Sequence, residues 1–169
     1  MQSISRKNFI LTTLAGAGGA LVLPQLLTAQ TTPAKTPKGD PLDKALVKEF
    51  VTVAHNNFDR LKELLQQTPD LLNAVHNLGG WDWEDAIGAA GHMGNREMAL
   101  FLLDKGARPT ICVAAMLGEL KVVKDFIKAF PHMKDAVGPH NISLLKHAKA
   151  GGAPAEKVVK YLTSVGAKE

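Results

Sequence analysis

The residues of this chain best suited to hold a metal ion are its six histidines. A zinc or nickel site needs three or four ligands that converge about 2.0–2.2 Å from the ion. His55 and His92 occupy similar turn positions, His76 and His140 each precede an asparagine in a long loop, and His147 lies in an expected short helix. No His-x-x-x-His or similar local pair occurs, so only the fold could assemble a site. We predict no metal ligand and no cofactor, because such histidines more often bridge backbone groups. An envelope metal-binding protein or enzyme that uses a histidine cluster is the alternative.

Other reactive residues lack the surroundings that catalysis requires. Ser143 and Ser164 are outside any Gly-x-Ser-x-Gly turn. Cys112 occupies an apolar position between Ile111 and Val113, which predicts an inert core thiol. The stretch "GAAGHMG" (88–94) has neither the Gly-x-Gly-x-x-Gly spacing after a strand nor the Gly-Lys-Ser/Thr ending of nucleotide-binding loops. We therefore predict that the protein is not an enzyme and has no catalytic residue.

Both tryptophans lie in one loop, "NLGGWDWED" (77–85), together with three acidic residues. Exposed aromatic side chains flanked by charges are typical contact centres for a protein or peptide partner. The alternative is that one tryptophan covers the core while Asp82 or Asp85 caps the next helix. We predict a partner-binding surface that consists of Trp81, Asp82, Trp83, Glu84, His92, Met93 and Met116.

Composition limits the classes of function. Of the 169 residues 46% are apolar, which is ordinary for a globular domain. The net charge is +4; without Arg6 and Lys7, Lys plus Arg falls from 20 to 18 against 16 acidic residues, about +2. This balance argues against a nucleic-acid partner, which requires concentrated positive charge. A single cysteine excludes an intramolecular disulfide.

The N-terminal residues are typical of an export signal. Arg6 and Lys7 precede an apolar run from Phe9 to about Leu27 that is interrupted by glycines and Pro24. The segment "SRKNFIL" (5–11) resembles the twin-arginine translocation signal, with lysine in place of the second arginine. We predict a signal peptide at 1–29, a flexible Thr/Pro/Lys-rich linker at 30–41, and a periplasmic or envelope location without stable membrane insertion after cleavage.

Helical periodicity recurs four times after residue 40. The apolar positions are one, three or four residues apart, which places each set on one face of a helix. A shorter helix rich in small residues precedes each set, and no segment shows the sustained alternation of a strand. The four sets are Leu61, Leu64 and Leu65; Met98, Phe101 and Leu102; Val122, Val123, Phe126 and Ile127; and Val158, Val159 and Leu162.

The units also repeat in sequence. Shifted forward by 62 residues, 52–75 aligns with 114–137 without a gap, and Pro69 meets Pro131. The run "AIGAAGHMGNREMALFLLDKGA" (86–107) resembles the ankyrin repeat: a small pair, a turn glycine two residues later, then an apolar helix that ends in Gly-Ala. "ICVAAMLGELKVVKDFI" (111–127) matches again. The wider run resembles a bacterial group of short ankyrin-type proteins. The Thr-Pro-Leu-His opening of the consensus is absent.

The resemblance implies an all-α, ankyrin-type helix–turn–helix solenoid of about four repeats. The repeat domain would span 42–169, with units at about 45–76, 84–107, 109–141 and 143–168. Such solenoids present an extended groove. We therefore predict a monomeric, non-catalytic module that recognises a protein or peptide in the bacterial cell envelope. An inhibitor or immunity-type binder is a further alternative.

Overall fold

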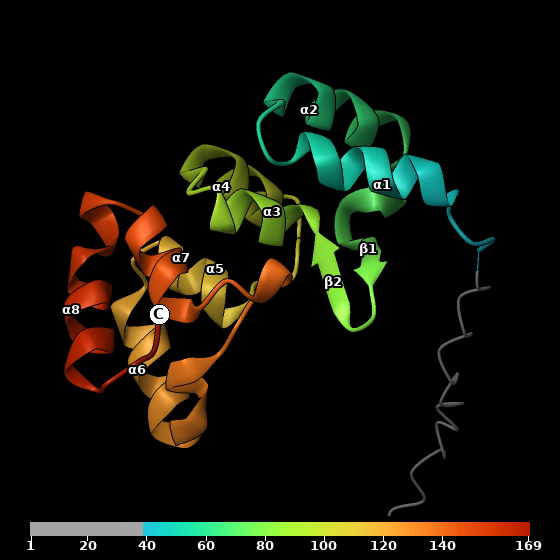
Figure 1. Ribbon diagram of the computed structural model, residues 1–169. Coiled ribbons are helices and arrows are strands. Elements are labelled where there is room, and N and C mark those ends of the chain that lie inside the picture. Colours follow the sequence, from blue (N-terminus) through green and yellow to red (C-terminus); the bar gives the residue numbers. More distant parts are fainter. Residues whose placement is uncertain (1–38) are drawn as a thin grey trace, which may run out of the picture. The chain divides into compact units, whose positions relative to one another are not determined.

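The computed structural model describes residues 39–169, and Asp40–Glu169 form one compact unit. This part of the chain contains eight α-helices, four short 3-10 helices and one two-stranded sheet (Figure 1). The α-helices are α1 (Lys44–Val53), α2 (Phe58–Gln67), α3 (Ala86–His92), α4 (Arg96–Asp104), α5 (Ile111–Met116), α6 (Leu120–Ala129), α7 (Leu144–Ala150) and α8 (Glu156–Ser164). The 3-10 helices are η2 (Pro69–Asn73), η3 (Pro131–Asp135), η4 (Pro139–Asn141) and η5 (Ala153–Ala155).

Side-chain caps determine where most of these helices begin. The first backbone N–H groups of a helix have no partner within it, and a short polar side chain at the N-cap satisfies one of them. Asp85 does so for α3, since its carboxylate accepts a hydrogen bond from the N–H of Gly88 at 2.8 Å. The same role is played by Asp43, Asn57, Asn95, Thr110 and Ser143 at the starts of α1, α2, α4, α5 and α7.

The helices form four consecutive pairs, and the first helix of each pair packs against the first helix of the next (Figure 1). Small residues in α3, such as Ala89, Ala90 and Gly91, are buried and let these helices approach closely. The apolar faces of α2 and α4 join a core that includes Leu61 and Leu102. The apolar faces of α6 and α8 close a second cluster around α5 and α7.

The expected all-α ankyrin-type solenoid is wrong. An antiparallel hairpin of β1 (Val75–Gly79) and β2 (Asp82–Asp85) lies between the first two helix pairs. In a regular solenoid each repeat contacts only its neighbours. Here α3 of the second pair also contacts α7 of the fourth, and β2 contacts η4.

The reason for this error is visible in the strands themselves. Four of the five residues of β1 are exposed, so the segment lacks the alternating burial that produces a strand pattern in sequence. The hairpin turns at Gly80 and Trp81; Gly80 and the preceding Gly79, the last residue of β1, have φ angles of +59° and +127°. Glycine reaches such angles without steric cost, whereas other residues rarely do. The two glycines therefore let the chain leave β1 and enter a tight turn in place of an irregular loop.

The predicted signal peptide (1–29) and most of the predicted linker (30–41) lie outside the described residues. Within 39–169, none of the helices has the length and apolarity needed to cross a membrane.

Candidate metal centre

The centre is built around the carboxylate of Glu84 in strand β2. Side chains alternate between the two faces of a strand, so Asp82 and Glu84 face one way while Trp83 and Asp85 face the other. The side chain of Glu84 is only 2% exposed. Burying a carboxylate is costly unless a cation or hydrogen-bond donors compensate it. The residues that surround Glu84 must therefore supply that compensation.

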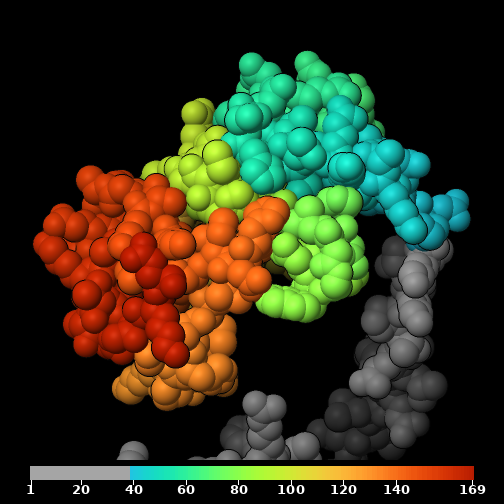
Figure 2. All heavy atoms as spheres, in the orientation of Figure 1, coloured from blue at the N-terminus to red at the C-terminus, as the bar shows by residue number. Residues whose placement is uncertain are grey.

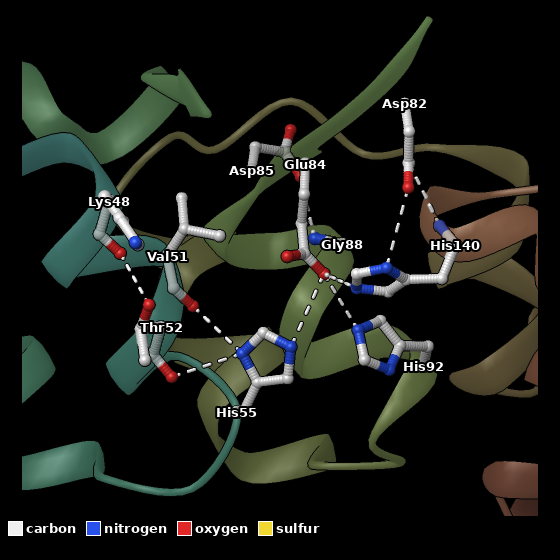
Figure 3. Close-up of polar contacts among 10 residues, drawn as sticks. All are labelled: Lys48, Val51, Thr52, His55, Asp82, Glu84, Asp85, Gly88, His92 and His140. Carbon is white, nitrogen blue, oxygen red and sulfur yellow. Dashed lines mark hydrogen bonds and ion pairs between the residues drawn. The ribbon is translucent and has the colours of Figure 1, made fainter. Parts of the chain in front are cut away.

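Three histidines from different parts of the fold converge on one oxygen of Glu84 (Figure 3). The Nε2 atoms of His92, His140 and His55 lie 2.8, 3.3 and 3.6 Å from Glu84 Oε1. His92 is the last residue of α3, His140 lies in η4, and His55 lies in the turn between α1 and α2. Across the described residues, the ion-pair partners of Glu84 are these histidines, with neither lysine nor arginine among them.

The backbone determines which nitrogen of His55 carries the hydrogen. Its Nδ1 lies 3.1 Å from the carbonyl oxygen of Val51 and 3.2 Å from that of Thr52. Carbonyl oxygens only accept hydrogen bonds, so Nδ1 is the protonated nitrogen. In the neutral imidazole, Nε2 then directs a lone pair at the oxygen of Glu84. Either a proton on Nε2 or a metal ion between the two atoms resolves this contact.

Asp82 orients His140 in a comparable manner. One carboxylate oxygen of Asp82 accepts a hydrogen bond from the backbone N–H of His140 at 3.0 Å. The other lies 3.6 Å from His140 Nδ1, on the far side of the ring from Glu84. His140 also has a left-handed backbone, with φ of +58°, which is uncommon outside glycine. Strained backbone of this kind is concentrated at functional sites.

The three distances from imidazole nitrogen to Glu84 Oε1 are close to those between neighbouring donors around a bound transition metal. In a tetrahedral site with bonds of about 2.0–2.1 Å, neighbouring donor atoms lie about 3.3 Å apart. The three distances from nitrogen to Oε1, 2.8–3.6 Å, span that value. One donor atom from each of the four residues lies within 4.8 Å of all the others. Small side-chain movements would therefore place an ion among them.

The remaining histidines lie outside this cluster. His76 is in β1 and His132 is exposed in η3. The ring of His147 in α7 is 6.4 Å from that of His92, centroid to centroid, but it is not one of the converging donors. The histidines that the fold brings together are therefore His55, His92 and His140, although we predicted no metal ligand from the sequence. No sequence pattern indicates that Glu84 joins them, because the acidic residues beside it in "WDWED" obscure the alternation of the strand.

The predicted partner-binding residues separate into three groups. Trp81 and Trp83 are 69% and 55% exposed, and Met93 is also exposed. Asp82, Glu84 and His92 belong to the candidate metal centre, where Glu84 and His92 are largely buried. Met116 is fully buried in the core at the end of α5. In this fold Met116 is therefore unable to contact a partner, because its apolar helix face packs inward.

Cys112 is buried, as the sequence predicted, and burial raises the pKa of its thiol to about 11. A thiol is a nucleophile only as thiolate, so Cys112 is unreactive near neutral pH.

No family model matches the chain, and no curated protein is significantly similar to it.

Proposed function

We propose that the protein binds one divalent transition-metal ion through Nε2 of His55, His92 and His140 and a carboxylate oxygen of Glu84. The observation that carries this proposal is the convergence of three imidazole nitrogens on one buried carboxylate oxygen. The tautomer of His55 adds to it, because its backbone partners leave Nε2 as a lone-pair donor for a metal.

The outer contacts of His55 and His140 are of the kind that metal-binding histidines make. Metal-binding histidines almost always donate their other ring N–H to a carbonyl or a carboxylate, which orients the ring. His55 has two such carbonyl partners; for His140, the carboxylate of Asp82 lies 3.6 Å from Nδ1, within ion-pair range but beyond hydrogen-bond distance. These contacts fix the orientation of the two rings, as a metal site requires.

The donor set also indicates the class of metal. Imidazole suits Zn²⁺, Cu²⁺, Ni²⁺ and Fe²⁺, whereas Ca²⁺ and Mg²⁺ prefer oxygen ligands. Three nitrogens and one carboxylate are therefore suited to an ion of the zinc class. The ion would connect the turn after α1, strand β2, the end of α3 and η4. From this position it would hold these segments together.

Calorimetric titration of the full chain with Zn²⁺ tests this proposal. We expect one ion per chain with submicromolar affinity, and a loss of at least about tenfold in Glu84→Gln or His92→Ala. The matched control is His132→Ala, which removes an exposed histidine outside the cluster. Flat traces for the unmodified protein, or equal loss in His132→Ala, would contradict the proposal.

A second function, recognition of a protein or peptide partner, is favoured by the exposure of Trp81 and Trp83. Large exposed aromatic side chains on a short hairpin supply contact area at low entropic cost. The metal centre lies beneath the same hairpin and would hold it in place. The two functions are therefore compatible.

Crosslinking of the tagged chain in its own host, followed by mass spectrometry, tests this second function. The proposal requires one captured protein that also binds the purified chain and is lost in Trp81→Ala/Trp83→Ala. A captured protein that binds the double variant equally well argues against the tryptophans as the contact centre.

A further inference from the structure

A second site lies on the opposite face of strand β2 from the metal centre. Trp83 and Asp85, which point away from Glu84, line a pocket of about 420 Å³. Pockets of about 300–1,000 Å³ are typical of small-molecule sites. In Figure 2 the surface is hollowed between the light green hairpin and the orange segment that follows η3. The pocket walls come from the hairpin, η3, η4 and the helices α5, α6 and α7.

The buried part of this pocket contains a polar atom without a partner. His147 is 0% exposed, and its Nδ1–H donates a hydrogen bond to the carbonyl oxygen of Ser143 at 2.9 Å. Its Nε2 must then be an acceptor, and within the described residues it has no hydrogen-bond partner. A buried acceptor left unsatisfied is destabilising and uncommon in folded proteins.

The position of Gly138 shows where this acceptor points. A Cβ atom added to Gly138 would lie 3.0 Å from His147 Nε2 and 3.5 Å from Cys112 Sγ. All three residues line the pocket. Gly138 therefore lies against the ring edge that carries Nε2, beside the thiol, where the pocket wall is formed. Burial lowers the pKa of His147, which keeps Nε2 unprotonated near neutral pH.

The rest of the pocket determines what kind of molecule it suits. Its more exposed lining is apolar and partly aromatic, with Val75, Trp83, Phe126 and Val137. Neither lysine nor arginine is among its lining residues, so an anion has no counter-charge there. The one lining carboxylate, Asp85, already accepts the N–H of Gly88. A ligand must therefore be largely apolar and neutral, with one donor for His147.

We propose that this pocket binds a small, neutral, aromatic molecule that carries one hydroxyl or N–H group, which donates a hydrogen bond to Nε2 of His147. The site is separate from the metal centre, because strand β2 lies between them and His147 is not among the converging donors. Its occupation would satisfy the unpaired acceptor and cover the exposed face of Trp83.

The test compares two probes of nearly equal shape by ligand-observed NMR on the full chain. The probe 2-naphthol carries a hydroxyl donor, and 2-methoxynaphthalene lacks it. We expect 2-naphthol to bind about tenfold more tightly, which is the upper range for one hydrogen bond to a buried acceptor. In His147→Leu this preference should disappear, because the acceptor is gone and the apolar pocket remains.

Zinc binding serves as the folding control for this variant, since His147 is not a proposed metal ligand. A His147→Leu protein that retains zinc affinity but loses the preference for 2-naphthol supports the pocket proposal. Equal affinities of the two probes for the unmodified protein would overturn it without reference to any variant. Failure of both probes to bind at millimolar concentration would overturn it as well, and neither result affects the metal centre.

Discussion

At the scale of single residues, metal binding depends on which ring nitrogen of each histidine carries a lone pair directed at the site, and not only on the number of histidines. Carbonyl oxygens of α1 fix the hydrogen of His55 on Nδ1, so its Nε2 faces Glu84 as an acceptor. Asp82 contacts both the backbone and the ring of His140. These contacts orient the rings of His55 and His140 in the absence of a metal ion. Preorganisation of this kind raises the affinity for the ion.

The contact between Asp82 and the ring of His140 gives a prediction for Asp82→Asn. The amide can still accept the backbone N–H of His140, but it lacks the negative charge that strengthens the ring as a metal ligand. We expect zinc affinity to fall about tenfold, at the lower end of the effect of such outer partners. Calorimetry measures the zinc affinity of the variant. An unchanged affinity would show that Asp82 only holds the backbone of the loop at His140.

The buried thiol gives a prediction on alkaline stability. The unfolded thiol ionises near pH 8.5, whereas burial raises the pKa of Cys112 in the folded protein to about 11. Between these values the folded state holds more protons, so stability must fall as pH rises. Relative to Cys112→Val, the unmodified protein should lose about 2 kcal/mol of unfolding free energy between pH 8 and pH 10. Urea titrations in the presence of a metal chelator measure the free energy of unfolding at each pH. If it changes with pH equally in the two proteins, the thiol is not held protonated in the folded state.

At the scale of elements, the β1–β2 hairpin determines the site. Because side chains alternate along a strand, Asp82 and Glu84 face the histidines, whereas Trp83 and Asp85 face the pocket on the other side of β2. The register pairs Val75 with Asp85 and His76 with Glu84, and β2 ends at the residue before α3 begins. A shift of one residue would move Glu84 to the wrong face.

The hairpin turn can be tested through Gly79, whose φ of +127° disfavours any side chain. Gly79→Val should weaken zinc binding about tenfold, because strain of about 1–3 kcal/mol opposes the hairpin that carries Glu84. The helical circular dichroism should change little. The matched control is Gly166→Val, at φ of +70° beyond α8, which carries similar strain but should leave zinc affinity unchanged. Equal losses of zinc affinity in both variants would show that zinc binding does not depend specifically on the hairpin.

The sequence predicted some of these elements and missed others for physical reasons. Periodicity located helices such as α2 and α6, because an amphipathic face repeats every three to four residues. It missed the hairpin because β1 is mostly exposed. The ligand Glu84 could not be inferred either, since that hairpin alone directs its side chain inward.

At the scale of the whole molecule, the proposed ion connects segments that are distant in sequence. The turn at His55 and the loop at His140 are 85 residues apart and both contact Glu84. The contact of α3 with α7 brings the helix pairs close enough for this. The all-α solenoid was a reasonable expectation from the repeats, but repeats alone do not reveal contacts between non-neighbouring units.

Such a connection should stabilise the fold when the ion binds. Free zinc at 100 times its dissociation constant contributes about 2.7 kcal/mol. For a folded unit of this size, that corresponds to a rise in Tm of about 8 °C. Scanning calorimetry should show this rise in the unmodified protein and in His132→Ala, but not in Glu84→Gln. A rise of the same size in Glu84→Gln would place the stabilising ion elsewhere.

Anomalous X-ray diffraction from crystals of the zinc-loaded protein, recorded at the zinc absorption edge, tests the central claim most directly. The account predicts one strong peak about 2.0–2.2 Å from Nε2 of His55, His92 and His140 and from a carboxylate oxygen of Glu84. A map without a peak there, or with zinc only at His76 or His132, would contradict the proposed metal centre.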